Sequence, residues 1–306
     1  MMISRKFLPQ WPSREGEYMK IAFLKRRTVK KTTSAFLVFV RTFWNRFINP
    51  PISKRQIFVF ETVVLTAGLL LTQLVSFDAR FEFVVGLFLC TYLLSAYSLR
   101  DNLSGIEWIT LLLPISFFSA GVALFYFLLP VRWLTRIPVA TLYAVGIYAL
   151  LLTNNIYNVA AIRTIALLRA ARSVGFLLSV LTFYLFGSTI VSQQNYAPFN
   201  AFFSGLVAFG VGMPLLWSIE LTPRLGKKVL HLSIALSVIV AQVSWILSFV
   251  PTPPAIIALT LTAVFYSIFG MGVEYLDEKL YKKTVTEFLL VNIFVFLILL
   301  LTTRWR

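Results

Sequence analysis

The sequence is poor in the residues that build most metal and redox sites. Its 306 residues include one cysteine and one histidine. With Cys90 alone, the chain can form neither an internal disulfide nor a thiolate cluster for zinc or iron–sulfur. With His231 alone, it excludes any site that needs two imidazoles from one chain. We therefore expect no metal and no cofactor.

The motifs of several enzyme classes are also missing. The sequence contains no phosphate-binding loop, no H-E-x-x-H pair and no G-x-S-x-G elbow. Its long apolar stretches contain no lysine, so a retinal Schiff base has no point of attachment. An enzyme is disfavoured, and an intramembrane enzyme stays open only as a third alternative.

Acidic residues are scarce, and the positive charge is concentrated at one end. The chain carries 28 Lys and Arg against 12 Asp and Glu, and residues 1–55 hold 13 of the basic residues but only two acidic ones. Each basic residue near an anionic membrane contributes about 1 kcal/mol of attraction. We expect this basic N-terminal head to bind anionic lipid headgroups; an acidic protein partner is an alternative, and nucleic acid is the less favoured one.

Within the head, residues 34–48 predict an amphipathic helix. Phe36, Phe43 and Phe47 share one helical face, whereas Arg41 and Asn45 lie on the other. Fifteen residues with two arginines are a poor membrane crossing and a good interfacial helix.

What the chain has in abundance is apolar length. Hydrophobic residues make up 58% of it, and about 20 apolar residues in a helix cross the ~30 Å hydrocarbon core. The predicted fold is all-α: a polytopic transmembrane helical bundle over residues 56–306, in contact with the lipid bilayer on its outer surface. The nine predicted spans cover residues 57–77, 82–98, 108–129, 138–157, 174–192, 199–219, 229–250, 254–273 and 286–303.

The connections between the spans predict the orientation. With the head in the cytoplasm, the inner connections carry ten Lys and Arg, and the outer side carries five. Cytoplasmic loops are enriched in Lys and Arg. We therefore predict a cytoplasmic N-terminus and a C-terminus outside.

Glu61 is an acidic residue inside the first predicted span. Ionisable groups in membranes are costly and often functional. Because Glu61 lies about two turns after Lys54, a carboxylate that reaches the surface or pairs with a cation is the simpler reading. A coupling or proton-relay role is the alternative.

A polar run at the end of the fourth predicted span is the second candidate site. Asn154 and Asn158 would share a helix face, and the arginines that follow could hold a phosphate or lipid headgroup through paired hydrogen bonds. The competing reading is a positively charged cytoplasmic loop whose amides cap the helix. The candidate residues of this headgroup site are Asn154, Asn155, Asn158, Arg163, Arg169 and Arg172.

Small residues recur every four positions in the sixth predicted span. Ser204, Ala208 and Gly212 form a stripe that is typical of close helix packing in membranes.

Two hypotheses of function remain. The first is a carrier, or a protein that handles lipids or other amphiphiles, with a path inside the bundle. The scarcity of charge in the spans favours an uncharged substrate. The second is a non-catalytic scaffold or subunit that uses its basic head. A cavity inside the bundle would favour the first, and a solid bundle the second.

Overall fold

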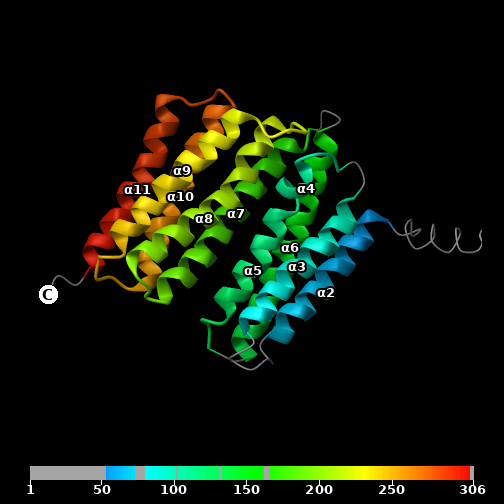
Figure 1. Ribbon diagram of the computed structural model, residues 1–306, viewed down its shortest axis with the longest axis horizontal. Coiled ribbons are helices and arrows are strands. Elements are labelled where there is room, and N and C mark those ends of the chain that lie inside the picture. Colours follow the sequence, from blue (N-terminus) through cyan, green and yellow to red (C-terminus); the bar gives the residue numbers. More distant parts are fainter. Residues whose placement is uncertain (1–52, 73–79, 101–102, 131–132, 162–165, 304–306) are drawn as a thin grey trace, which may run out of the picture. The chain divides into compact units, whose positions relative to one another are not determined.

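The computed structural model describes residues 53–72, 80–100, 103–130, 133–161 and 166–303, which form helices and turns. The basic head and the predicted interfacial helix at 34–48 lie outside these residues, apart from Ser53, Lys54 and Arg55. The chain divides between Ser53 and Lys54, and the unit that begins at Lys54 is described below (Figure 1).

The described residues of this unit form ten helices. They are α2 (Lys54–Thr72), α3 (Arg80–Leu99), α4 (Glu107–Thr110), α5 (Leu113–Tyr126), α6 (Trp133–Ala160), α7 (Leu168–Ser192), α8 (Ala197–Glu220), α9 (Lys227–Leu247), α10 (Pro254–Leu276) and α11 (Lys282–Thr302).

In the described residues, nine helical segments are long and apolar enough to cross a membrane, each matching one of the nine predicted spans. The third span is not one uninterrupted helix. It breaks into α4 and α5 at Leu111 and Leu112, because Pro114 lacks the N–H that would continue the hydrogen-bond ladder.

The fourth span is longer than predicted. We expected it to begin at Pro138, but α6 begins a turn earlier, at Trp133, and keeps Pro138 inside the helix. The ring of a proline clashes with the carbonyl four residues before it, so near the start of a helix it disturbs only the first turn. The longer helix contains both Arg136 and Asn158.

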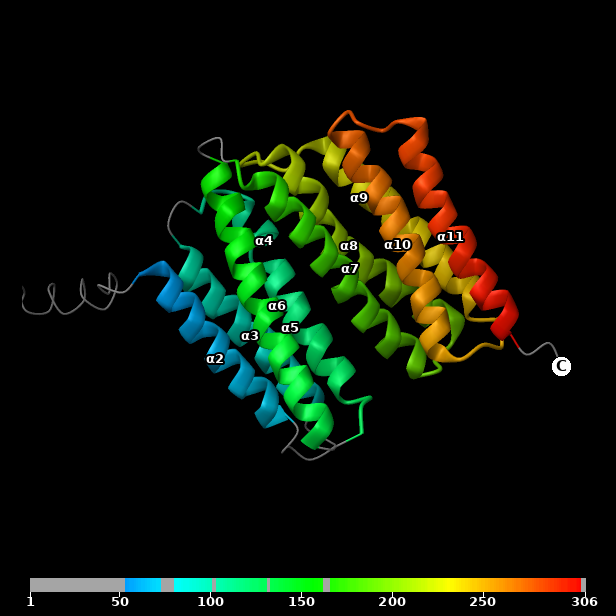
Figure 2. The ribbon, with the colours of Figure 1, turned by 180° about the vertical axis from the view of Figure 1, so that it is seen from behind.

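Two hydrophobic cores fill the unit. One consists mainly of side chains from α2, α3, α5 and α6, and the other mainly of side chains from α8, α9 and α10. Helix α7 contributes to both, with Leu178 and Leu185 in the first core and Phe183 and Val191 in the second. It therefore joins the two groups of helices (Figures 1 and 2).

A turn at one end of the bundle also links the two groups. Gly105 has φ +53°, and a Cβ added there would lie 2.3 Å from the carbonyl oxygen of Pro223. The backbone N–H of Ile106 donates to this same oxygen at 3.2 Å. Only glycine meets both requirements, since it adopts positive φ freely and has no Cβ.

Candidate functional site

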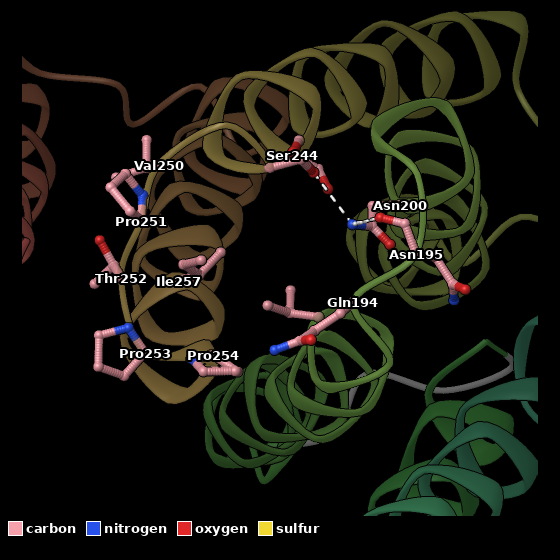
Figure 3. A pocket seen from close by; sticks show the side chains of 12 residues that line it. Gln194, Asn195, Asn200, Ser244, Val250, Pro251, Thr252, Pro253, Pro254 and Ile257 are labelled. Carbon is pink, nitrogen blue, oxygen red and sulfur yellow. Dashed lines mark hydrogen bonds between the residues drawn. The ribbon is translucent and has the colours of Figure 1, made fainter.

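A polar pocket of about 580 Å³ opens at the end of the bundle that is predicted to be outside (Figure 3). Its walls come from four consecutive helices, α7, α8, α9 and α10, and from the turns that join them. Among the described residues that line it, none carries a formal charge. Its polar residues are Gln194, Asn195, Asn200, Ser244, Ser248 and Thr252.

The turns hold the mouth of this pocket open. Gln194 has φ +52°, which turns the chain out of α7. On the opposite wall, Pro251, Pro253 and Pro254 surround Thr252. Prolines donate no backbone hydrogen bond, so this turn cannot extend α9. The hydroxyls of Thr252 and Thr303 lie 3.0 Å apart and fix the turn to the end of α11.

Asn200 is the most constrained polar group of the pocket. Its Nδ2 donates to the Ser248 hydroxyl at 3.2 Å and to the Asn195 carbonyl at 3.3 Å. Its Oδ1 is buried and has no hydrogen-bond partner among the described residues. Because buried polar atoms in native structures are nearly always paired, this oxygen is an acceptor that a bound hydroxyl or amide could satisfy.

A stack of three phenylalanines lies deeper in the same group of helices, beyond the residues that line the pocket. The rings of Phe183 and Phe265 are 4.3 Å apart and nearly parallel, and Phe269 lies 4.5 Å from Phe265. All three side chains are at most 1% exposed. Phe265 follows the lining residue Ile257 by two helical turns, or about 12 Å. We call these three residues the aromatic plug.

A second, much smaller cavity lies nearer the opposite end of the bundle. Its volume of about 20 Å³ has room for a single water. Hydroxyls of Thr110, Ser179 and Ser218 line it together with Asn154, which is 3% exposed. The Nδ2 of Asn154 has no hydrogen-bond partner among the described residues. This atom can therefore donate to a molecule in the cavity.

Two prolines from different helices border the Asn154 cavity. Pro114 lies in the first turn of α5, directly after the break between α4 and α5, and Pro214 lies inside α8. Interrupted helices in membranes are tolerated where the freed backbone groups are buried in protein or line a cavity, and such segments often mark transport sites.

An apolar groove of about 330 Å³ runs along the outside of the α8–α9 pair. Ala201 lines this groove, and the neighbouring Asn200 lines the polar pocket. The two helices are packed closely here, because a Cβ on Gly205 would meet the Cβ of Ala241 at 3.0 Å. A polar pocket and an apolar groove therefore share one pair of helices.

The residues that were predicted to form one headgroup site lie in several separate places in the structure. Asn154 lines the small cavity, while Asn158 donates from Nδ2 to the carbonyl of Leu99 at 3.0 Å. Asn155 is half-buried. The three amide side chains therefore have different surroundings.

The arginines of that prediction are divided in the same way. Arg172 donates to the Ile219 carbonyl at 3.1 Å and pairs with Asp277 at 3.5 Å. Its guanidinium thus connects α7 to the ends of α8 and α10. Arg169 is exposed, and Arg163 lies outside the described residues.

The simpler interpretation of Glu61, in which its carboxylate reaches the surface of the bundle, does not fit the structure. Its side chain is 2% exposed. The hydroxyl of Ser95 donates to Oε1 at 2.6 Å, and the hydroxyl of Ser98 donates to Oε2. The carboxyl is thus enclosed between α2 and α3.

The residues of the small-residue stripe are buried and contact different helices. The Ser204 hydroxyl accepts a hydrogen bond from Ser244 of α9 at 3.0 Å. Gly212 lies under the ring of Phe269, whose Cε1 is 2.0 Å from the position of an added Cβ. Ala208 is fully buried between them.

Two pairs of polar residues in the sequence could have indicated the large pocket, but we did not use them. Asn200 and Ser204 are four apart on α8, and Ser244 and Ser248 are four apart on α9. Polar pairs at this spacing on otherwise apolar spans mark one face of each helix. Which two faces meet, however, is decided only by the packing of the helices.

The nine apolar helices of the described residues are consistent with a multi-pass helical membrane protein. In the described residues, no group of three His, Cys, Asp or Glu side chains comes together as a metal site would require. The chain belongs to the family described as "Protein of unknown function (DUF5656)", which matches residues 96–302. This range contains all residues that line the polar pocket and the Asn154 cavity. No match is found among curated proteins or among solved structures.

Proposed function

We propose that the protein is a carrier of uncharged amphiphiles, whose polar part enters the pocket formed by α7–α10. The observation that supports this most is the pocket itself: about 580 Å³, with six polar lining residues and no formal charge among the described lining residues. An anionic or cationic group would lose its hydration there without gaining a counter-charge. Hydroxyl and amide groups of a neutral molecule would find partners, beginning with Asn200 Oδ1.

The apolar groove supports an amphiphile rather than a small hydrophilic solute. It lies on the outer surface of the same helix pair, and its residues are apolar except for Ser237. A hydrocarbon chain in this groove would stay in contact with lipid while its polar end reached the pocket.

The aromatic plug supports alternating access. The pocket opens at one end of the bundle, and the buried rings of Phe183, Phe265 and Phe269 stack about 12 Å deeper than Ile257, where they would separate the pocket from the other end. Transport requires this barrier to open and the mouth to close. Helix α8, which supports Phe269 through Gly212, also contains Pro214, and prolines are the commonest cause of helix kinks.

The proposal is tested by lipid movement across vesicles that contain the purified protein. Fluorescent glucosylceramide serves as the neutral probe and fluorescent phosphatidylserine as the anionic one. Dithionite bleaches only the outer leaflet, so bleaching beyond the outer-leaflet share reports lipid that has crossed. We expect the neutral probe to cross and the anionic probe to stay.

Two variants at the end of α9 make the test specific. Ser248→Trp fills the pocket and is expected to stop the movement of the neutral probe. Ile246→Trp adds the same ring two residues away, at a position 64% exposed on the outside of the helix, and is expected to leave the movement unchanged. Equal bleaching of vesicles with and without the protein would contradict the proposal, as would equal loss in both variants.

A further inference from the structure

The other group of helices contains a buried acid that the carrier proposal does not use. Glu61 of α2 lies seven residues after Lys54, or about 10 Å from the start of its helix. It accepts hydrogen bonds from Ser95 and Ser98 of α3, which are 0% and 6% exposed. Asn158 of α6 bonds the carbonyl of Leu99, the residue after Ser98. Three helices therefore meet around this carboxyl.

Packing alone does not explain why this residue is an acid. Polar side chains do join membrane helices through hydrogen bonds, but both donors to Glu61 are neutral hydroxyls. A glutamine would accept one of these bonds through its oxygen and donate to the other serine through its nitrogen, without placing an ionisable group in the membrane, which costs several kcal/mol. Only a carboxyl group at this position can bind and release a proton.

A second group of buried hydroxyls lies one helical turn further along α3, deeper in the bundle. Thr91 lies one helical turn before Ser95 on α3, and its hydroxyl donates to Ser119 Oγ of α5 at 3.0 Å. The oxygens of Ser119 and Tyr143 of α6 are 2.7 Å apart. Thr91, Ser119 and Tyr143 are at most 1% exposed. Hydroxyls of three helices thus lie together inside an apolar core.

We infer that Glu61 is a proton-binding site, reached from the end of the bundle that is predicted to be cytoplasmic. A proton from water at this end adds to Oε2 of the carboxylate, which becomes a neutral carboxylic acid. The new O–H donates to Ser98 Oγ, and the hydrogen of that serine turns to a backbone carbonyl one turn back, as serines in helices commonly do. Release follows the same steps in reverse.

Other ionisable groups near this site come from each helix around it. Helix α6 contributes the phenol of Tyr143. Arg100 follows the end of α3, two residues after Ser98, and its guanidinium lies 4.6 Å from the centre of the Tyr97 ring. On its own helix, Glu61 is preceded by Lys54 and Arg55, which begin α2.

The site is independent of the carrier proposal. Glu61 and Ser95 precede residue 96, where the family match begins, and neither lines the polar pocket or the Asn154 cavity. Failure of lipid transport would therefore leave the proton site standing, and the reverse also holds.

Infrared difference spectroscopy tests the site in the full-length protein reconstituted in lipid. Spectra are compared between mildly acidic and mildly alkaline buffer. We expect a protonated carboxyl band that appears on acidification and is lost in Glu61→Gln. In Glu61→Asp the band is expected to remain, with a shift, because a carboxyl is still present. In the double variant Ser95→Ala/Ser98→Ala it is expected to move to higher frequency, since the carboxyl loses its hydrogen bonds.

A second buried acid provides the matched control. Glu107 is 3% exposed and accepts hydrogen bonds from the backbone N–H of Ser104 at 2.8 Å and from its hydroxyl at 3.2 Å, which hold the turn that precedes α4. Glu107→Gln is expected to keep the band. The inference is overturned if no carboxyl band responds to pH, if the band persists in Glu61→Gln, or if the double serine variant leaves its frequency unchanged.

Discussion

Replacing Phe265 by alanine is expected to open the interior of the bundle to reagents applied at the pocket end. In a Cys90→Ser background, the reporter is Ser218→Cys, which lines the small cavity beyond the aromatic plug. With Phe265 present, an impermeant maleimide added outside should leave this cysteine unlabelled. Without the ring, which is 0% exposed and stacked on Phe183, labelling should become detectable.

Two controls separate an opened plug from a loosened protein. Phe118 is also buried and stacks on Tyr143, but in the other core; Phe118→Ala has a similar cost of about 3–5 kcal/mol and should leave Ser218→Cys unlabelled. Thr252→Cys at the mouth should react from outside without any change to the plug, and Lys282→Cys should not. Labelling of Ser218→Cys with Phe265 intact, or of Lys282→Cys, would contradict the account of the plug or the predicted orientation.

Gly212→Ala is expected to destabilise the protein by about 1–3 kcal/mol, the range found for overpacked cores. An added Cβ would lie 2.0 Å from Cε1 of Phe269. This ring has little room to retreat, because it packs on Phe265 at 4.5 Å. The measurement is the unfolding temperature of the protein in nanodiscs.

Gly187→Ala in α7 is the matched control for that change. A Cβ at Gly187 would find nothing within 4 Å, and alanine favours helix over glycine by about 1 kcal/mol. Its unfolding temperature should stay the same or rise. Equal effects of the two substitutions would show that Gly212 is not held under the aromatic plug.

The helices could be predicted from the sequence because each span is a local property. Twenty apolar residues must form a helix in lipid whatever surrounds them, and so the nine segments agree with the prediction. The break at Leu111 and Leu112 was missed although Pro114 signals it, because hydropathy averages across a proline. The predicted start of α6 was too late because Pro138 was taken as the beginning of the helix, whereas the helix continues through this proline.

The pocket could not be predicted in the same way. Asn200 and Ser248 are 48 residues apart, and nothing in the hydropathy of two spans says that their polar faces meet. Glu61 was noticed, but its surroundings depend on Ser95 and Ser98, two ordinary hydroxyls on the next span. The arginines show most clearly what the sequence does not reveal. Arg172 forms an ion pair with Asp277 at the end of α10, which lies more than a hundred residues later in the chain.

The central claim, that the polar pocket belongs to a carrier, is tested most directly by distances across its mouth. Tyr196 is 88% exposed beside Asn195, and Ala255 is exposed beside Pro254. Spin labels at Tyr196→Cys and Ala255→Cys in the Cys90→Ser protein, reconstituted in lipid, report this distance by pulsed electron paramagnetic resonance. A carrier must close the mouth before the aromatic plug opens, so we expect two distance populations, of which the shorter gains weight when glucosylceramide is added. A single narrow distance that the lipid does not change would identify a static bundle and contradict the carrier.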